Sequence, residues 1–233
     1  MRTPLALLLP VALSTACSGD DAMMTAQPDA PDVITPDAPG LPTADELRAA
    51  IATCNVVGGK YAENGGGTAT VDICGLPTAV FWKADLDVDC DGKETAKCNL
   101  QTDPYFQNQT AAVDSMGDPL DAATLPFVVV PGVSPRWSYR DAGLTMGSVV
   151  AVIYKDKVAY GPLGDVGPTA SIGEASYAMA ELLGINPDPR IGGTSDEVAY
   201  IAFIGPDAKV KPIEDHAKAV ELGVAHARAL LSP

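Results

Sequence analysis

The stretch Tyr160-Gly-Pro-Leu-Gly-Asp-Val-Gly-Pro-Thr-Ala-Ser-Ile-Gly-Glu-Ala-Ser176 is the most informative part of this chain. Its glycines predict a turn between apolar segments, and it carries two carboxylates, Asp165 and Glu174, nine residues apart. A pair of carboxyl groups is the usual equipment for cleaving a bond between sugars, because one protonates the leaving oxygen while the other activates water. Asp165 and Glu174 are therefore candidate catalytic residues.

Both carboxylates also have structural interpretations that stay open at this point. Ser171-Ile-Gly-Glu174 fits a capping box, in which the glutamate side chain reaches back to the first amide of a helix running to Leu183. Asp165 fits the role of a turn residue. The spacing alone does not decide between structure and catalysis.

Outside this stretch, short segments with strand-like patterns dominate the chain. They are residues 68–74, 79–83, 127–130, two strands within 148–160 around Lys155-Asp156-Lys157, and residues 198–204. Helices are expected at residues 44–53, opened by the capping box Thr43-Ala-Asp-Glu46, at 174–183, closed by Gly184, and at 213–231. The predicted fold class is mainly β, with peripheral helices.

The N-terminal region predicts export. Residues 1–16 combine one basic residue, an apolar run and small residues, as a signal peptide does. Cys17 follows directly and resembles the lipidated cysteine of bacterial lipoproteins, with ordinary cleavage near Ala16 as the alternative. Residues 17–42, rich in Pro, Asp and Ala, predict a disordered tether, and residues 43–233 predict the folded catalytic domain. We expect a bacterial outer-membrane or cell-surface lipoprotein, or a secreted protein.

The remaining cysteines predict disulfides. They are an even set in an oxidising compartment: Cys54, Cys74, Cys90 and Cys98. Three pairings are possible, and the short loop between Cys90 and Cys98 favours that bridge, with Cys54–Cys74 as the other. A zinc site is the competing hypothesis, but the Cys-x-x-Cys spacing is missing and both histidines lie far along the chain. We therefore expect no metal.

The formal net charge is −15, from 15 basic and 30 acidic residues. This balance argues against a nucleic acid or an anionic lipid surface as the partner, and it allows a cationic one. Acidity of this kind also serves solubility alone. The charge therefore becomes informative only together with the motifs.

The segment Asp85-Leu-Asp87-Val-Asp89-Cys-Asp91-Gly92 places four carboxylates at alternate positions. In an extended backbone all four point to one face, where their repulsion needs solvent, a cation or a polycationic ligand. Part of the segment matches the start of an EF-hand calcium loop, but the twelfth position is Cys98 instead of glutamate. A cationic sugar chain is therefore favoured over calcium.

Several ordered motifs resemble one family. They are Phe81-Trp-Lys-Ala-Asp-Leu-Asp-Val-Asp-Cys-Asp-Gly92, Asp103-Pro-Tyr-Phe-Gln-Asn-Gln-Thr110, Ala151-Val-Ile-Tyr154, the stretch 160–176, Leu183-Gly-Ile-Asn-Pro-Asp-Pro189, Gly192-Gly193 and Tyr200-Ile-Ala-Phe203. Together they resemble the glycoside hydrolase family 75 chitosanases over roughly residues 54–205. Several motifs in one order are more specific than any single short pattern.

The resemblance implies endo-hydrolysis of β-1,4 bonds in chitosan, a glucosamine polymer, with inversion and without a cofactor. It implies Glu174 as general acid and Asp165 as general base, about 6.5–9.5 Å apart. Substrate-binding residues are then expected among the acidic and aromatic side chains, namely Asp85, Asp87, Asp89, Asp91, Trp82 and Tyr160. By fold analogy it implies a six-stranded, double-psi-like β-barrel with a surface groove.

Two other functions stay open. One is a hydrolase of the same barrel group that acts on peptidoglycan, whose sugars carry N-acetyl and lactyl groups. The other is a polysaccharide-binding lipoprotein without catalysis. For each we expect a monomer with no nucleic-acid partner, and membrane contact only through a lipid at Cys17.

Overall fold

The computed structural model describes residues 40–232. The predicted signal peptide, Cys17 and nearly all of the tether lie outside the described residues. The helices are α1 (Ala44–Ala50), α2 (Tyr177–Leu183) and α3 (His216–Leu231), with a short 3-10 helix η1 (Pro206–Ala208). The strands are β1 (Cys74–Gly75), β2 (Ala79–Asp89), β3 (Val128–Pro131), β4 (Val149–Tyr154), β5 (Lys157–Gly167), β6 (Glu174–Ser176) and β7 (Thr194–Phe203).

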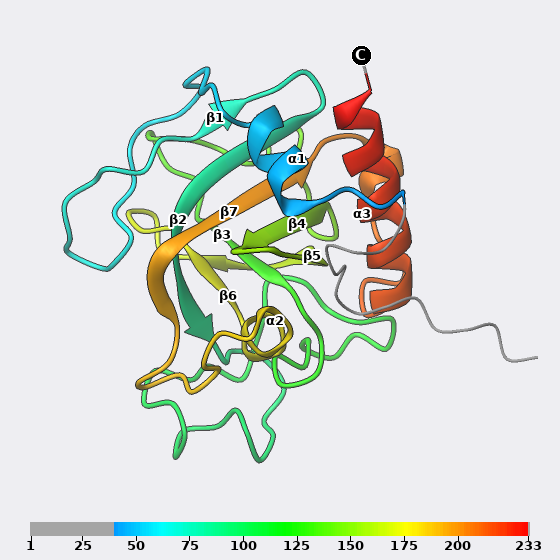
Figure 1. Cartoon of the computed structure of the whole chain (residues 1–233). Coiled ribbons are helices and arrows are strands. Elements are labelled where there is room, and N and C mark those ends of the chain that lie inside the picture. Colours follow the sequence, from blue (N-terminus) through cyan, green and yellow to red (C-terminus); the bar gives the residue numbers. More distant parts are fainter. Residues whose placement is uncertain (1–39, 233) are drawn as a thin grey trace, which may run out of the picture.

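Six of the strands form a closed barrel (Figure 1). Their order is β2-β6-β3-β5-β4-β7, and the pairing of β7 with β2 closes the ring. The pairs β2–β6 and β3–β5 are parallel, and the other pairs are antiparallel. The prediction of a mainly β barrel with peripheral helices is confirmed.

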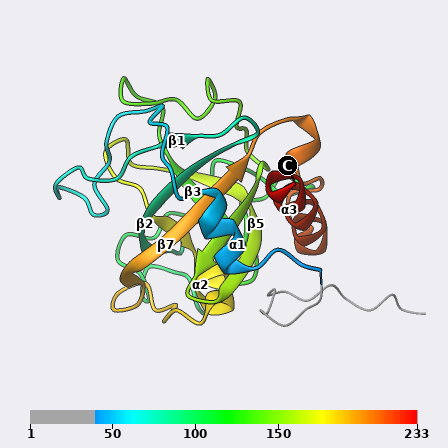
Figure 2. The same ribbon diagram turned by 45° about the horizontal axis from the view of Figure 1, so that its top comes forward.

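Apolar side chains fill the barrel and also cover part of its outside. The inner core includes Trp82 stacked on Tyr200, with ring centroids 5.3 Å apart. A second core forms where α3 packs on the outer face of β4 and β5 and α1 packs against α3 (Figure 2). Because each barrel strand alternates its side chains between two faces, the strands hold both cores at once.

The structure corrects two expectations for the stretch 160–176. Asp165 lies within strand β5 and not in a turn. Glu174 begins strand β6 and caps no helix, because residues 174–176 are paired with β2 and Ala175 is also paired with Val128 of β3. The helix starts after Ser176, whose hydroxyl oxygen accepts from Met179 N at 3.2 Å.

Other element boundaries also shift. The Thr43 capping box and the left-handed Gly184 at the end of α2 are confirmed. Helix α1 ends at Ala50, and α3 starts at His216 behind the N-cap Asp215. The expected strand at residues 68–74 is wrong: only isolated bridges at Val71 and Cys74 and the start of β1 form there. The bridges Tyr61–Val71 and Val56–Cys74 are separate, so no continuous ladder extends along the segment.

Both predicted disulfides are present, as Cys54–Cys74 and Cys90–Cys98. The first joins the loop after α1 to β1, and the second closes a short loop at the end of β2. Within residues 40–232 there is no helix of the length and apolarity needed to cross a lipid bilayer.

An irregularity at Gly164 decides where Asp165 points. Leu163 is opposite Val128, but Asp165, two residues later, is opposite the next residue Val129. The extra residue in β5 is a β-bulge, which reverses the alternation of side chains. Leu163 therefore faces the barrel core, whereas Asp165 faces outward.

Replacement of Gly164 tests this bulge. A Cβ atom there would lie 2.7 Å from Phe127 Cγ. We expect Gly164→Ala to lower the free energy of unfolding by about 1–3 kcal/mol, because the ring and the backbone must shift. Chemical denaturation measures this, with Gly65→Ala as the control because a Cβ at Gly65 has nothing within 4 Å. Equal stability of the two variants would contradict the tight approach.

Candidate active site

Strand register aligns three carboxylates across the outside of the barrel. Asp87 of β2 is directly opposite Glu174 of β6, and Asp165 of β5 is directly opposite Val129 of β3. Since Val128 is opposite Ala175, Val129 lies beside Glu174 across the β3–β6 pair. Residues opposite each other in a sheet point to the same face. Asp87, Glu174 and Asp165 therefore form one row.

The two candidate catalytic residues are separated by one strand. Strand β3 lies between β5 and β6, so the backbones of Asp165 and Glu174 are two strand spacings apart, about 10 Å. The Glu174 side chain leans across β3, because a Cβ on Gly167 of β5 would lie only 2.6 Å from Glu174 Oε2. Gly167 thus leaves room for the glutamate to approach Asp165.

Asp165 is held by the backbone. Its Oδ1 accepts from Ala111 N and from Val166 N, each at 2.7 Å. Burial raises the pKa of this carboxyl group, since its residue is only 8% exposed, and the two N–H groups act in the opposite direction. The hydrogen bonds from the two backbone N–H groups fix the orientation of the carboxyl group and favour its charged form.

Glu174 is in a different environment. Burial is the main cause that raises the pKa of its carboxyl group to about 7, and the charges of Asp87, Asp91 and Asp165 add to this effect. At mildly acidic pH Glu174 therefore keeps a proton. A proton donor and, on the same face, a carboxyl group that accepts two backbone hydrogen bonds are the parts that an acid–base pair needs.

Three further aspartates lie around this pair: Asp85, Asp89 and Asp91. Together with Asp87, Asp165 and Glu174 they form what we call the acidic cluster. Ala84 and Leu86 face the barrel core, so the alternate residues of β2 face outward with the site. The expectation of one acidic face is confirmed for the aspartates within β2. Asp91 lies just beyond the strand end.

Burial dominates the electrostatics of these aspartates. It raises the pKa of Asp85 to about 7, with further effects of Asp87 and Glu63, while Asn64 Nδ2 donates to Asp85 Oδ2 at 3.1 Å. It raises the pKa of Asp89 well above its usual range. It also raises the pKa of Asp91 to about 6. Each of these groups favours its neutral form more than a free aspartate does.

Within the part of the chain that the structure describes, no ion pair balances these charges. Among the ion pairs formed within residues 40–232, none uses a carboxylate of the acidic cluster. Asp89 Oδ2 and Asp85 Oδ1 are buried without a hydrogen-bond partner. Strand β2 holds Asp87 and Asp89 in extended backbone, which is not the loop of an EF-hand. The cluster can therefore bind protons or an external cationic ligand.

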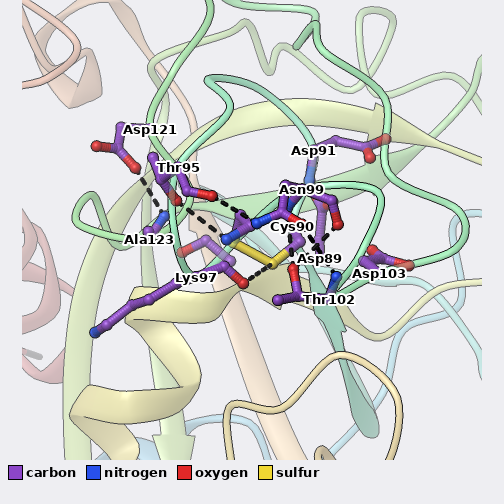
Figure 3. Close-up of a disulfide and its surroundings, with 12 residues drawn as sticks. Asp89, Cys90, Asp91, Thr95, Lys97, Asn99, Thr102, Asp103, Asp121 and Ala123 are labelled. Atoms are coloured by element: carbon purple, nitrogen blue, oxygen red, sulfur yellow. Dashed lines mark hydrogen bonds between the residues drawn. A yellow bond between two sulfur atoms is a disulfide. The ribbon is translucent and has the colours of Figure 1, made fainter.

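The Cys90–Cys98 disulfide fixes the end of the acidic segment (Figure 3). Cys90 lies between Asp89 and Asp91, and Asp89 Oδ1 accepts from Asp91 N at 2.8 Å. On the other side, Asp91 Oδ1 accepts from Gln107 N at 2.6 Å. The disulfide and these two bonds keep the aspartates close to the row.

Two proposed substrate-binding residues lie elsewhere. Trp82 and Tyr160 are both 0% exposed, in the inner and the outer core respectively. A sugar cannot reach either ring, so their interpretation as substrate contacts is wrong and they are core residues. The sequence patterns did not indicate three residues that contact the acidic cluster: Asn64, Gln107 and Ala111. Gln107 and Ala111 act through backbone N–H groups, which no side-chain pattern reveals.

Comparison with known proteins shows similarity to one family. The model for the fungal chitosanases of glycosyl hydrolase group 75 matches residues 86–226, which include Asp87, Asp165 and Glu174. Endo-chitosanase B of Aspergillus oryzae is 34% identical over 146 residues, covering 55% of this chain and 61% of that protein. An endo-chitosanase of Aspergillus fumigatus is 32% identical over 143 residues, covering 55% of this chain and 60% of the relative. The chain thus spans about three fifths of the length of these curated relatives.

The raised pKa values predict a stability that falls with pH. Asp85 and Glu174 keep protons in the folded state up to about pH 7, whereas in the unfolded chain they lose them near pH 4. Their contribution to stability is therefore complete below about pH 4 and is lost as pH rises through about 7. We expect the melting temperature to fall between pH 5 and pH 8.

Asp85→Asn supplies the matched test by differential scanning calorimetry. The variant should flatten this pH dependence and raise the melting temperature at pH 8 by about 3 °C, because it removes one buried charge. Asp156→Asn, in the exposed turn between β4 and β5, is the control and should leave the slope unchanged. A wild-type melting temperature that rises from pH 5 to pH 8 would contradict the proposed burial of protonated carboxyl groups.

Proposed function

The chain belongs to glycosyl hydrolase group 75, the fungal chitosanase family, and from this membership we propose that it is an endo-acting chitosanase. It hydrolyses β-1,4 bonds inside chains of glucosamine. The observation that carries the proposal is the row across β2, β6 and β5, in which Glu174 has a pKa of about 7 and Asp165 accepts two backbone hydrogen bonds. The two carboxyl groups thus differ in the way that an acid and a base must differ.

In the proposed reaction, Glu174 is the general acid. It donates its proton to the glycosidic oxygen as the bond from that oxygen to the anomeric carbon breaks. Asp165 is the general base and takes a proton from a water molecule, whose oxygen bonds to the anomeric carbon from the opposite face. At the end Asp165 holds a proton and Glu174 is ionised. Exchange with solvent restores both groups.

Inversion at the anomeric carbon is the proposed outcome. It requires a water molecule between the two carboxyl groups, which should then lie about 6.5–9.5 Å apart, whereas a nucleophilic carboxylate would lie about 5–5.5 Å from the acid.

The acidic cluster explains the choice of a cationic substrate. Glucosamine units are ammonium ions at mildly acidic pH, and an acidic site that forms no ion pair within residues 40–232 attracts them. Asp87 and Asp91 are half-buried, so their carboxylates are accessible for direct contact. Asp85 is buried, and Asp85 and Asp89 each have one carboxyl oxygen enclosed without a hydrogen-bond partner, so they are less available for direct contact. The surface groove expected along this face stays a prediction.

Export and membrane attachment belong to the same proposal. Two disulfides in one domain are typical of proteins that fold in an oxidising compartment. We propose a signal peptide at residues 1–16 and a lipid on Cys17, from the sequence alone, because both lie outside the described residues. A lipid on Cys17 would hold the domain at a membrane surface and leave its active site in solvent.

Peptidoglycan is the second candidate substrate. It would use the same two carboxyl groups, but its N-acetylated sugars carry no ammonium group for the acidic cluster to bind. The cluster therefore favours chitosan. A binding protein without catalysis is disfavoured, because both carboxyl groups are present in the row.

Substitution of the two carboxyl groups tests the function. We expect Asp165→Asn and Glu174→Gln each to reduce hydrolysis of soluble chitosan at mildly acidic pH by about 10²–10⁴-fold, because each removes one proton transfer. Release of reducing ends is the measurement. Glu221→Gln, on the exposed side of α3 and paired only with Lys218 in the described structure, is the control and should retain full activity.

Three results would contradict the proposal. Folded Glu174→Gln with wild-type activity would exclude its role as the acid. Folded wild-type protein that is inert on chitosan but cuts peptidoglycan would move the function to the second substrate. Tight binding of chitosan without any release of reducing ends would favour the non-catalytic alternative.

A further inference from the structure

Tyr105 is an aromatic side chain placed unlike the others. Its 86% exposed fraction is the highest among the exposed large apolar residues of the described chain. Other aromatic residues of the same motifs, including Trp82 and Phe106, are buried. Exposure alone is common for single apolar residues, so the meaning of Tyr105 depends on what holds it and what lies beside it.

The backbone on both sides of Tyr105 is fixed. Asp103, which is buried, accepts through Oδ1 from Tyr105 N at 2.9 Å, and its carbonyl oxygen accepts from Phe106 N at 3.2 Å. Phe106 itself packs in a small core with the Cys90–Cys98 disulfide and Val129. The ring of Tyr105 therefore projects into solvent from an ordered turn. A fixed aromatic ring loses little conformational freedom when a ligand binds it.

The same loop forms a wall of the active site. Two residues after Tyr105, Gln107 donates to Asp91 and its carbonyl oxygen accepts from Gly92 N at 2.8 Å. Two residues of extended chain span at most about 7 Å, so Tyr105 lies close to the acidic cluster. Further along the loop, Ala111 donates to Asp165. The loop thus carries Tyr105 and contacts to two carboxylates of the cluster.

A second exposed apolar side chain, Ile191, lies on a segment that is joined to the loop of Tyr105. Arg190 Nη2 donates to Gln101 O at 2.8 Å and ties this loop to the segment that contains Ile191. Ile191 is 80% exposed. That segment reaches the site at Gly193, where a Cβ would lie 2.4 Å from Leu86 O and 3.6 Å from Asp87 Cα. Two loops that contact the acidic segment therefore each carry one exposed apolar side chain.

A sugar ring has the complementary chemistry. Its hydroxyl and ammonium groups lie at the edges, and its two faces are largely C–H. An aromatic ring can cover such a face and can also attract a nearby ammonium group. A carboxylate cluster that binds ammonium groups, next to an exposed aromatic ring, can hold one glucosamine unit by its edge and its face together.

We propose that Tyr105 stacks on a glucosamine unit bound next to the bond that is cleaved, and so forms a substrate subsite. This inference rests on the proposed function and adds a contact that involves no proton transfer. The stacked unit is bound equally in the ground state and in the transition state, so Tyr105 lowers KM and leaves kcat nearly unchanged.

The test measures binding separately from catalysis. In the inactive Glu174→Gln background, calorimetry with the glucosamine hexamer should show a Kd about tenfold higher after Tyr105→Ala, and within about twofold after Tyr105→Phe, which keeps the ring. Met116→Ala is the matched control, because Met116 is 84% exposed and lies in a turn whose neighbour Ser115 is bonded to Glu214. In the active enzyme, Tyr105→Ala should raise KM for the hexamer by a similar factor, with kcat within about twofold.

The outcomes separate this inference from the function on which it rests. Hexamer binding unchanged by Tyr105→Ala, in a protein whose wild type cuts chitosan, would overturn the subsite and leave the function standing. A fall in kcat at constant KM would also overturn the subsite as described. If the Glu174→Gln protein binds no hexamer and the wild type cuts none, both proposals are overturned.

Discussion

The burial of carboxyl groups held close together in one row is the constraint on which the site depends. Strand register places Asp87, Glu174 and Asp165 on one face, and no ion pair formed within residues 40–232 neutralises any of the three. Such a cluster can lower its free energy by holding protons or by binding external cations. In the proposed function, the first response supplies the proton that a general acid needs, and the second supplies affinity for ammonium groups. One arrangement thus accounts for both the proposed chemistry and the proposed substrate.

The rest of the fold keeps this unfavourable arrangement in place. The inner core fixes the strands, the bulge at Gly164 turns Asp165 outward, and the Cys90–Cys98 disulfide holds the end of β2. The loop that contains Tyr105 completes the site, since its backbone amides bind Asp91 and Asp165. The stable barrel therefore holds in place carboxyl groups that would separate in a flexible chain.

The sequence predicted the fold class, the disulfide pairing and the two central carboxyl groups, and it failed where pairing between distant strands decides the outcome. Glu174 satisfies the local pattern of a capping box, but β2 and β3 supply its neighbours, so a strand forms instead. Trp82 and Tyr160 lie in motifs of the family, yet the barrel encloses both. The bulge at Gly164 and the amide of Ala111 leave no side-chain signal, because each acts through the backbone. Local patterns cannot report these long-range contacts.

The stereochemistry of the first product tests the central claim most directly, namely that Asp165 and Glu174 act as base and acid across an intervening strand. Proton NMR during hydrolysis of the glucosamine hexamer distinguishes the anomers before they interconvert. The account predicts that the α-anomer appears first, because water attacks from the face opposite the β-linked leaving group. Initial formation of the β-anomer would require a covalent intermediate and a closer pair of carboxyl groups, and it would contradict the account.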